Sequence, residues 1–489
     1  MPSLKKNFFY SALLTVANYV FPLITYPYVS RVLGVTGIGV CNFVDNIINW
    51  FIVFSTMGIS VLGVREIAAV REDRAGRDSV FSSLLALSGA STLLAALVLL
   101  GAIFVIPSLQ PYRNLLFIGV AKLVFHSLNL EWFFRGAEEF KYITNRTVLI
   151  KLFYVAAIFL FVRTSDDYAV YYLLLTLTIV VNTLVNVVYA RKFVSLKPSG
   201  IRLARYAAPF FLLGMNYVLT SVYTSCNVIY LGFVSGTEQV GYYTSATKII
   251  TLITALFSAF TTVLLPRMSA VLSEGKTDEF KLYVSRTFSI LFLVGIPLVI
   301  LLEIGAADVI RVISGPGYEG AVVPMMIVAP LAVIIGLEQI LIIQILMPQK
   351  RDRQILINSG AGALVAVVVN LLLVRMLKAS GSAIVWLCAE LTVFLFALNA
   401  VFGKAWQEFP WKTLLKDLLL YIPLALILVA IQRIPFPNAF VRLFADCAVV
   451  GVYFALLTCL VVRDPVILGL VNPLVQRFAP KQHGDQENR

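Results

Sequence analysis

The sequence predicts an all-α polytopic membrane protein with about 14 transmembrane helices. Of its 489 residues, 60% are hydrophobic and 13% are charged, whereas a soluble domain holds about 25% charged residues. The mean hydropathy is +0.89. Apolar stretches near the 20 residues that cross a hydrocarbon core recur along the whole chain. A large soluble core would instead need helices with polar faces, which most of these stretches lack.

The expected spans are joined by short connections that leave no room for a folded soluble domain. The first span follows Lys5 and Lys6 without a small-residue cleavage site, so we expect it to be retained. In chain order the expected spans are 8–30, 38–61, 80–106, 114–134, 147–162, 169–190, 207–231, 241–265, 287–306, 323–346, 355–374, 382–402, 418–432 and 441–462.

The basic residues give the orientation of these spans. The formal net charge is +13, from 39 Lys and Arg against 26 Asp and Glu. With a cytoplasmic N-terminus, 28 of the 39 bases fall in inside segments and eight in outside segments; Lys122, Lys151 and Lys248 lie within spans. Such asymmetry predicts cytoplasmic termini by the positive-inside rule. The charge is then a topology signal, and we expect no nucleic-acid partner.

Motifs for other chemistry are missing. The five cysteines fall within apolar spans without a CxxC pair, which argues against a disulfide framework or a zinc site. No GxxxxGK[ST] loop is present, and the two histidines, His126 and His483, suggest no catalytic set. We therefore expect neither a cofactor nor a metal. The outside segment 307–322 holds the turn-forming sequence SGPGYEG.

Polar residues form three stripes on otherwise apolar helices. Charged side chains are costly inside a bilayer, yet Asp45, Lys122, Lys248, Glu338 and Glu390 all lie within expected spans. The stripes, whose members are three or four residues apart, are Asn42, Asp45, Asn46 and Asn49; Lys122, His126 and Asn129; and Asn216, Thr220, Tyr223 and Asn227. Facing lipid, they would leave polar groups unsatisfied, so we expect them to face a wet cavity.

Other readings of these residues stay open. Lys248 lies seven residues past Gly241, about 10 Å along a helix, so it could snorkel to the outer interface or pair with an acid. Lys151, four residues into its span, is expected to snorkel. Glu338 and Glu390 have no clear stripe, so structural pairing and function remain alternatives. His126 is either a core histidine or a functional member of the Lys122 stripe.

The two halves of the chain echo each other. Segment 26–48 resembles segment 228–250: each has Leu-Gly, a short loop with glycine, then a glycine followed eight residues later by an Ile-Ile pair. Aligning Gly39 with Gly241 places Asn46 opposite Lys248. This pattern suggests two six-span units, as in transporters built from repeats around a substrate path.

Three segments near the N-terminus resemble characteristic blocks of bacterial polysaccharide (O-antigen type) flippases: YPYVSRVLGVTGIGVCNF (26–43), MGISVLGVREIAAVRED (57–73) and LEWFFRGAEEFKYITNRTVLIK (130–151). The segment TEQVGYYTSATKI (237–249) resembles the start of the second half of such proteins. The family lies in the multidrug/oligosaccharidyl-lipid/polysaccharide exporter superfamily, which also contains lipid II flippases.

The resemblance implies two six-helix bundles in a V shape around a central cationic cavity, and two additional C-terminal helices outside them. We expect the N-terminal bundle at 1–205, the C-terminal bundle at 206–403, the extra spans at 404–463 and a cytoplasmic tail at 464–489. In lipid II flippases the extra helices help form a groove for the lipid tail. The implied location is the bacterial cytoplasmic (inner) membrane.

The implied substrate is an undecaprenyl-pyrophosphate-linked oligosaccharide, moved from the inner to the outer leaflet by alternating access. Partners would be this substrate, membrane lipid, and a glycan polymerase or other assembly proteins. Lys122 and Lys248 would bind the pyrophosphate. The other expected cavity residues are His126, Asn46, Asn49, Asn129, Asn216 and Asn227. Asp45, Glu338 and Glu390 are candidates to carry a coupling ion; Asp45 could also pair with Lys248.

Two alternative functions are a multidrug exporter and a membrane-embedded glycan-assembly enzyme. A multidrug exporter on the same fold would favour an acidic cavity, because its substrates are cationic. A membrane-embedded glycan-assembly enzyme would need a sizeable outer loop, and the outer segments are short. We therefore expect a transporter with no catalytic residues, in which Asp45→Asn uncouples transport from an ion gradient.

Overall fold

The computed structural model describes residues 4–197, 200–403 and 409–458, and within these ranges it contains helices and turns but no β-strand. The first half consists of α1 (Leu4–Thr56), α2 (Ile59–Ala69), α3 (Arg74–Val105), η1 (Pro107–Tyr112), α4 (Arg113–Ser127), α5 (Glu131–Gly136), α6 (Phe140–Phe161), η2 (Ser165–Asp167) and α7 (Tyr168–Ala190).

The second half begins with α8 (Leu203–Ser221), η4 (Val222–Cys226), α9 (Asn227–Ser235), α10 (Thr237–Ser273), α11 (Thr277–Ile304), α12 (Ala306–Ile313) and η5 (Glu319–Ala321). It continues with α13 (Val322–Val328), α14 (Leu331–Gln339), η6 (Ile340–Leu346), α15 (Asp352–Val369), η7 (Asn370–Val374) and α16 (Arg375–Phe402). The last described helices are α17 (Trp411–Leu420), α18 (Ile422–Gln432) and α19 (Ala439–Leu457).

Twelve helical segments of the described chain are long and apolar enough to cross a membrane. Two of them are much longer than one crossing: 13–69 has 57 residues and 352–402 has 51, against about 20 for a single span. Each contains a residue with non-helical backbone angles, Gly34 (φ 66°) in α1 and Lys378 (φ 52°) in α16. These breaks lie at expected turns between spans. The all-helical membrane fold is confirmed, and the total of about 14 crossings stays a prediction.

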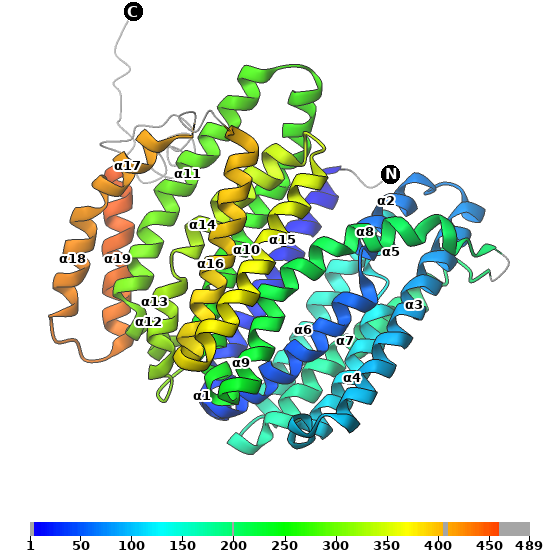
Figure 1. Cartoon of the computed structure of the whole chain (residues 1–489), viewed down its shortest axis with the longest axis horizontal. Coiled ribbons are helices and arrows are strands. Elements are labelled where there is room, and N and C mark those ends of the chain that lie inside the picture. The colour runs from blue at the N-terminus through cyan, green and yellow to red at the C-terminus, as the bar shows by residue number, and fades with distance from the viewer. Residues whose placement is uncertain (1–3, 198–199, 404–408, 459–489) are drawn as a thin grey trace, which may run out of the picture.

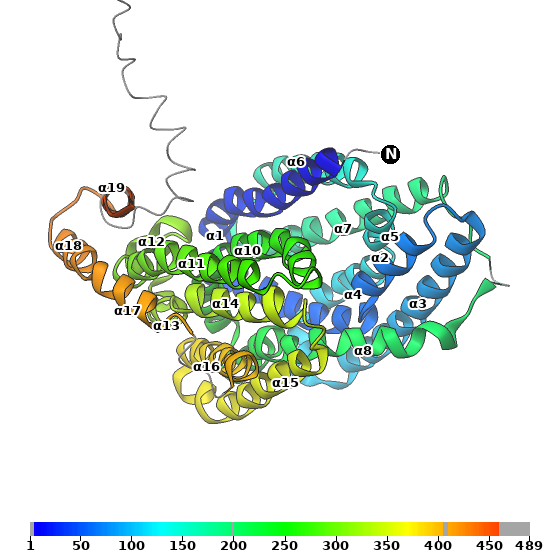
Figure 2. The same cartoon turned by 90° about the horizontal axis from the view of Figure 1, so that it is seen from above.

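The helices form two groups with α1 and α9 between them. Figure 1 shows α3, α4, α6 and α7 on one side, and α10, α11, α14, α15 and α16 on the other; the groups diverge toward the end of the molecule marked N. α18 and α19 stand at the outer edge of the second group, where they pack on α11 and α12 (Figure 2). Of the expected domain boundaries, 205 falls in the first turn of α8 and 403 just after α16, whereas 463 lies outside the described residues.

The two halves touch through a pair of glycines. A Cβ added to Gly39 would lie 1.8 Å from the Thr237 carbonyl oxygen, and one added to Gly241 would lie 2.2 Å from the Val35 carbonyl oxygen. Only glycine allows such close backbone approach. The alignment that pairs Gly39 with Gly241 also pairs Val35 with Thr237. The contact of Gly39 with Thr237 in one half therefore corresponds to the contact of Gly241 with Val35 in the other. This two-fold relation supports the internal repeat.

The segment that connects the two halves, between α7 and α8, is hydrogen-bonded to α3. The Asp78 carboxylate accepts a hydrogen bond from the Ser195 backbone N–H at 2.9 Å and an ion pair from Lys197 at 3.1 Å. The Ser83 hydroxyl accepts from the Arg202 N–H at 2.9 Å. The chain is thus fixed to the first group of helices up to the start of α8.

Candidate functional site

The centre of the predicted site is an ion pair between α1 and α4. The Lys122 ammonium lies 2.5 Å from Asp45 Oδ1 and donates a second hydrogen bond to Asn49 Oδ1 at 3.3 Å. Asn49 in turn donates to Asp45 Oδ2 at 3.0 Å. The side chains of Lys122 and Asp45 are 12% and 26% exposed, so the pair is shielded but reachable. The structure therefore brings two of the three predicted stripes together.

Lys248 occupies a different environment on α10. Its ammonium lies 5.3 Å from the centroid of the Tyr26 ring, a cation–π contact. The Tyr26 hydroxyl is hydrogen-bonded to the Ser245 hydroxyl at 2.6 Å, which fixes the ring. Within the described residues no carboxylate contacts Lys248, although Asp45 interacts with it electrostatically. Asp45 therefore forms its direct ion pair with Lys122 and not with Lys248.

His126 and Asn129 extend the Lys122 stripe away from this pair. His126 Nδ1 is buried without a hydrogen-bond partner, and the ring lies close enough to Lys122 to interact electrostatically. Asn129 Oδ1 accepts from the Asn186 side chain of α7 at 3.0 Å. That same Asn186 accepts a hydrogen bond from the Arg146 guanidinium. Asn129 thus belongs to a polar network between helices.

Arg146 and Tyr26 are residues that the sequence reasoning missed. Arg146 is only 7% exposed and sits on α6 among polar side chains, although its segment was expected to lie in an inside connection. The neighbouring stripe of Asn182 and Asn186, four residues apart, is the signal that could have revealed a polar partner. No comparable signal identifies Tyr26.

The remaining asparagines differ in accessibility. Asn46 donates to the Asn42 carbonyl of its own helix at 2.8 Å, and Asn216 accepts from the Ser359 hydroxyl at 2.7 Å. Asn227 is fully buried; it donates to the Ser382 carbonyl at 2.9 Å and to the Tyr243 hydroxyl at 3.2 Å. Its amide therefore joins α9, α10 and α16 in this conformation.

Glu338 and Glu390 form a separate acidic pair between α14 and α16. Their carboxyl groups lie close enough to interact electrostatically, Trp386 Nε1 donates to Glu390 Oε1 at 3.0 Å, and Glu338 Oε2 is buried without a hydrogen-bond partner. Two carboxylates held close together repel each other, and a proton shared between them relieves that repulsion. No hydrogen bond or ion pair within the described ranges joins these two residues to Asp45 and Lys122.

The comparisons with known proteins agree with this architecture. A family model described as polysaccharide biosynthesis protein matches residues 4–272, more than half of the chain. The chain belongs to this family. Two relatives of the chain bear the name "Putative O-antigen transporter". The one from Escherichia coli K12 is 26% identical over 397 residues, covering 80% of this chain and 95% of that protein. The one from Shigella dysenteriae is 24% identical over 420 residues, covering 81% and 100%.

Solved structures share the fold of this polysaccharide biosynthesis protein. A lipid II flippase MurJ in an inward closed conformation superposes with a TM-score of 0.77 at 12% identity, covering 96% of this chain and 100% of MurJ. An inward-facing multidrug resistance MATE transporter of the MOP superfamily gives 0.57 at 17% identity, covering 81% and 96%. The resemblance predicted from sequence is confirmed: the family is that of polysaccharide biosynthesis proteins, the relatives are named as O-antigen transporters, and the multi-pass helical fold is shared with MurJ and MATE structures.

Proposed function

We propose that this protein flips an undecaprenyl-pyrophosphate-linked oligosaccharide from the inner to the outer leaflet of the bacterial cytoplasmic membrane by alternating access. The names of the O-antigen transporters and the fold shared with a lipid II flippase support this substrate class. The observation that carries the proposal is Lys248. Its ammonium is held on Tyr26 without a contacting carboxylate among the described residues, near the Asp45–Lys122 pair of the other half.

The two lysines would bind the pyrophosphate in different ways. Lys248 offers a point charge that no carboxylate of the described residues contacts, and such a charge is suited to phosphate. Lys122 is compensated by Asp45, so a phosphate must compete with that carboxylate for it. His126, Asn46, Asn49, Asn129 and Asn216 would offer polar groups to sugar hydroxyls, and Asn227 would do so only if the helices around it separate.

The coupling ion is best assigned to the acidic pair. Asp45 is already neutralised by Lys122 at 2.5 Å. Glu338 and Glu390 are neighbouring acids, and no base among the described residues forms an ion pair with either of them, so they can hold and release a proton without breaking a salt bridge. Substitutions of this pair, and not Asp45→Asn, are therefore expected to uncouple transport from the ion gradient.

The orientation follows from the charge distribution. Cytoplasmic termini place the more basic connections on the side where the lipid-linked glycan is taken up. The lipid tail would remain in the membrane while the headgroup crosses between the two groups of helices. Glycan polymerase and other assembly proteins would act on the delivered unit.

A flipping assay in liposomes tests the proposal. The purified protein is reconstituted with a fluorescent undecaprenyl-pyrophosphate oligosaccharide, and the rate at which inner-leaflet label becomes accessible to an external quencher is measured. Losing one charge-assisted contact costs about 1.5–3 kcal/mol, so Lys248→Ala should weaken substrate binding by roughly 10- to 100-fold. Lys151→Ala is the matched control, because that lysine lies within a span but donates to Asn18 at 2.7 Å, away from the site.

The outcomes separate the function from the mechanism. Flipping by the wild type that Lys248→Ala abolishes and Lys151→Ala preserves supports both. Equal flipping by all three proteins keeps the function and removes Lys248 from the binding site. No flipping by the wild type, with several glycans and imposed ion gradients, would refute the flippase proposal.

A further inference from the structure

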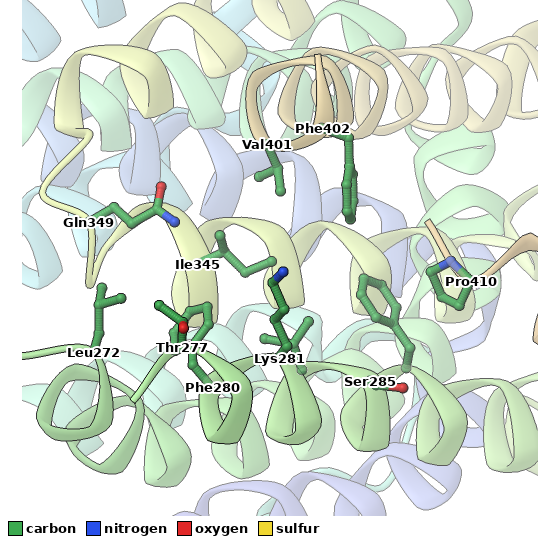
Figure 3. A pocket seen from close by; sticks show the side chains of 12 residues that line it. Leu272, Thr277, Phe280, Lys281, Ser285, Ile345, Gln349, Val401, Phe402 and Pro410 are labelled. Carbon is green, nitrogen blue, oxygen red and sulfur yellow. The ribbon is translucent and has the colours of Figure 1, made fainter. Parts of the chain in front are cut away.

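A pocket away from the central lysines opens between α11, η6 and α16. Its volume is about 620 Å³, within the range of about 300–1,000 Å³ that is usual for ligand sites. It lies where three connections meet: the turn between α10 and α11, the turn after η6, and Pro410 before α17. Figure 3 shows Lys281 of α11 extending between Ile345 of η6 and Phe402 of α16.

The wall formed by α11 is amphipathic along the pocket. Phe280, Val284 and Phe288 are spaced four residues apart and line it with apolar surface. Thr277, Lys281 and Ser285, spaced in the same way, form a parallel polar stripe, and Gln349 faces them from the turn after η6. A ligand that fits both stripes must itself have a polar end and an apolar body.

One side of the pocket is formed by a cluster of aromatic rings packed around Phe409. Phe409 packs edge-to-face on Phe288 at 5.4 Å and on Phe402 at 6.1 Å between ring centroids. The Trp411 ring packs in a tilted arrangement against the same Phe409, with 4.4 Å between centroids, and Trp411 is 39% exposed. Trp is enriched at the membrane–water interface, which agrees with a pocket at the depth of lipid headgroups and upper acyl chains.

The charge at this pocket is uncompensated. Of the three acidic residues in the α10–α11 connection, Glu274 pairs with Lys276 at 2.6 Å and Glu279 with Arg267 at 2.7 Å, whereas Asp278 forms no ion pair within the described residues. Lys281 forms no ion pair within the described residues. An ammonium beside a largely apolar surface is stabilised by an anion, and the surrounding connections are basic, which attracts anionic lipid.

We propose that this pocket binds an anionic phospholipid of the leaflet at this end of the molecule. The phosphate sits on the Lys281 ammonium with Ser285 and Gln349 as further hydrogen-bond partners, and the upper acyl chain lies along Phe280, Val284 and Phe288. Liquid water takes about 30 Å³ per molecule, so the pocket has room for roughly 20 non-hydrogen atoms. That is enough for the glycerophosphate part and the first carbons of one chain, not for a whole lipid.

Lipid retention measured on the full-length protein tests this site. The purified protein is incubated with phosphatidylglycerol or the zwitterionic phosphatidylethanolamine, and retained lipid is counted by native mass spectrometry. Lys281→Gln should lower phosphatidylglycerol binding roughly fivefold, the effect of one surface charge near anionic lipid, and leave phosphatidylethanolamine binding unchanged. Ser285→Trp, which fills the pocket, should lower the binding of both. Lys276→Gln is the control, a lysine of the same connection that is paired with Glu274.

Competition identifies the source of the phosphate. Soluble glycerol phosphate should not displace bound phosphatidylglycerol, because it lacks the apolar body. Displacement by glycerol phosphate at the same concentration, or preference for undecaprenyl phosphate over phosphatidylglycerol, would overturn the assignment to a phospholipid. Unchanged retention in Lys281→Gln, with Ser285→Trp equally unaffected and both variants eluting as folded protein, would remove the site altogether. Flipping of the glycan lipid is measured separately, so the result does not depend on the proposed function.

Discussion

The contact between α1 and the SGPGYEG turn should hold one end of the molecule closed. Ser30 donates to the Ile313 carbonyl at 3.3 Å, and the buried Tyr318 hydroxyl donates to the Ser30 carbonyl at 3.0 Å. Arg31 donates to the Val312 carbonyl at the end of α12. Gly315, with φ +95°, lets this turn approach so closely that an added Cβ would lie 2.7 Å from Arg31 Cγ. Since α1 and this turn belong to opposite halves, opening this end requires these bonds to break.

Tyr318→Phe removes one of these bonds while keeping the ring in its pocket. A typical intramolecular hydrogen bond contributes about 0.5–1.5 kcal/mol, which corresponds to a factor of roughly 2–13 in a two-state equilibrium. We expect Tyr318→Phe to raise the population open at this end by such a factor. Arg31→Ala, which removes a charged donor, should raise it further.

Spin labels on the two halves can measure this population. In a variant without reactive cysteines, labels at the exposed positions Arg163 and Glu319 report the separation of the halves at this end as a distance distribution. Tyr242→Phe is the matched control, because the Tyr242 hydroxyl donates to Glu238 within α10 and crosses no boundary. A distribution that stays the same in Tyr318→Phe and in Arg31→Ala would refute the role of this contact.

Three further expectations concern charged groups. Glu390→Gln should abolish the dependence of flipping on an imposed proton gradient, because the pair with Glu338 loses its exchangeable proton; flipping that still follows the gradient contradicts this. Asp45→Asn should retain the gradient dependence but tighten pyrophosphate-lipid binding, by freeing Lys122 from its 2.5 Å pair; binding titrations that show no gain would exclude competition. Arg442→Ala should lower the thermal stability in detergent, because it leaves the 2% exposed Asp308 without its bidentate partner, a loss of about 3–5 kcal/mol; an unchanged melting temperature would show the pair to be dispensable.

The sequence could predict which helix faces are polar but not how the helices meet. Asp45 and Lys122 were each predicted from a stripe of polar residues three or four apart on its own helix. Their pairing, however, depends on how α1 packs against α4. The same spacing predicted that Asn227 lines the cavity, although packing against α16 buries this residue completely. Periodicity gives the face of one helix, and the neighbour that covers this face comes from another part of the chain.

The sequence likewise predicted the turn at 314–320 but not the helix that it contacts. The glycines of SGPGYEG predict a turn, and Gly315 and Gly317 do have positive φ. Their contact with α1, nearly 300 residues away in sequence, has no local signal. Arg146 was missed for another reason: the ends of spans are the least defined part of a hydropathy pattern, and a shift of a few residues moves this base from a loop into the interior.

The positions of these groups along α1 and α10 suggest how closure and substrate binding are connected. The halves touch at Gly39 and Gly241. Asp45 lies six residues beyond the first glycine and Lys248 seven beyond the second, so both charges are about 9–10 Å from the contact. Ser30 and Arg31, which hold the turn at 314–320, lie in the part of α1 before the break at Gly34, eight to nine residues ahead of Gly39. A rotation of the halves about the glycine contact that separates Tyr318 from Ser30 must therefore also change the distance between Lys248 and the Asp45–Lys122 pair. A pyrophosphate bridging both lysines would favour one of these arrangements, so substrate binding and the state of the closed end should be coupled.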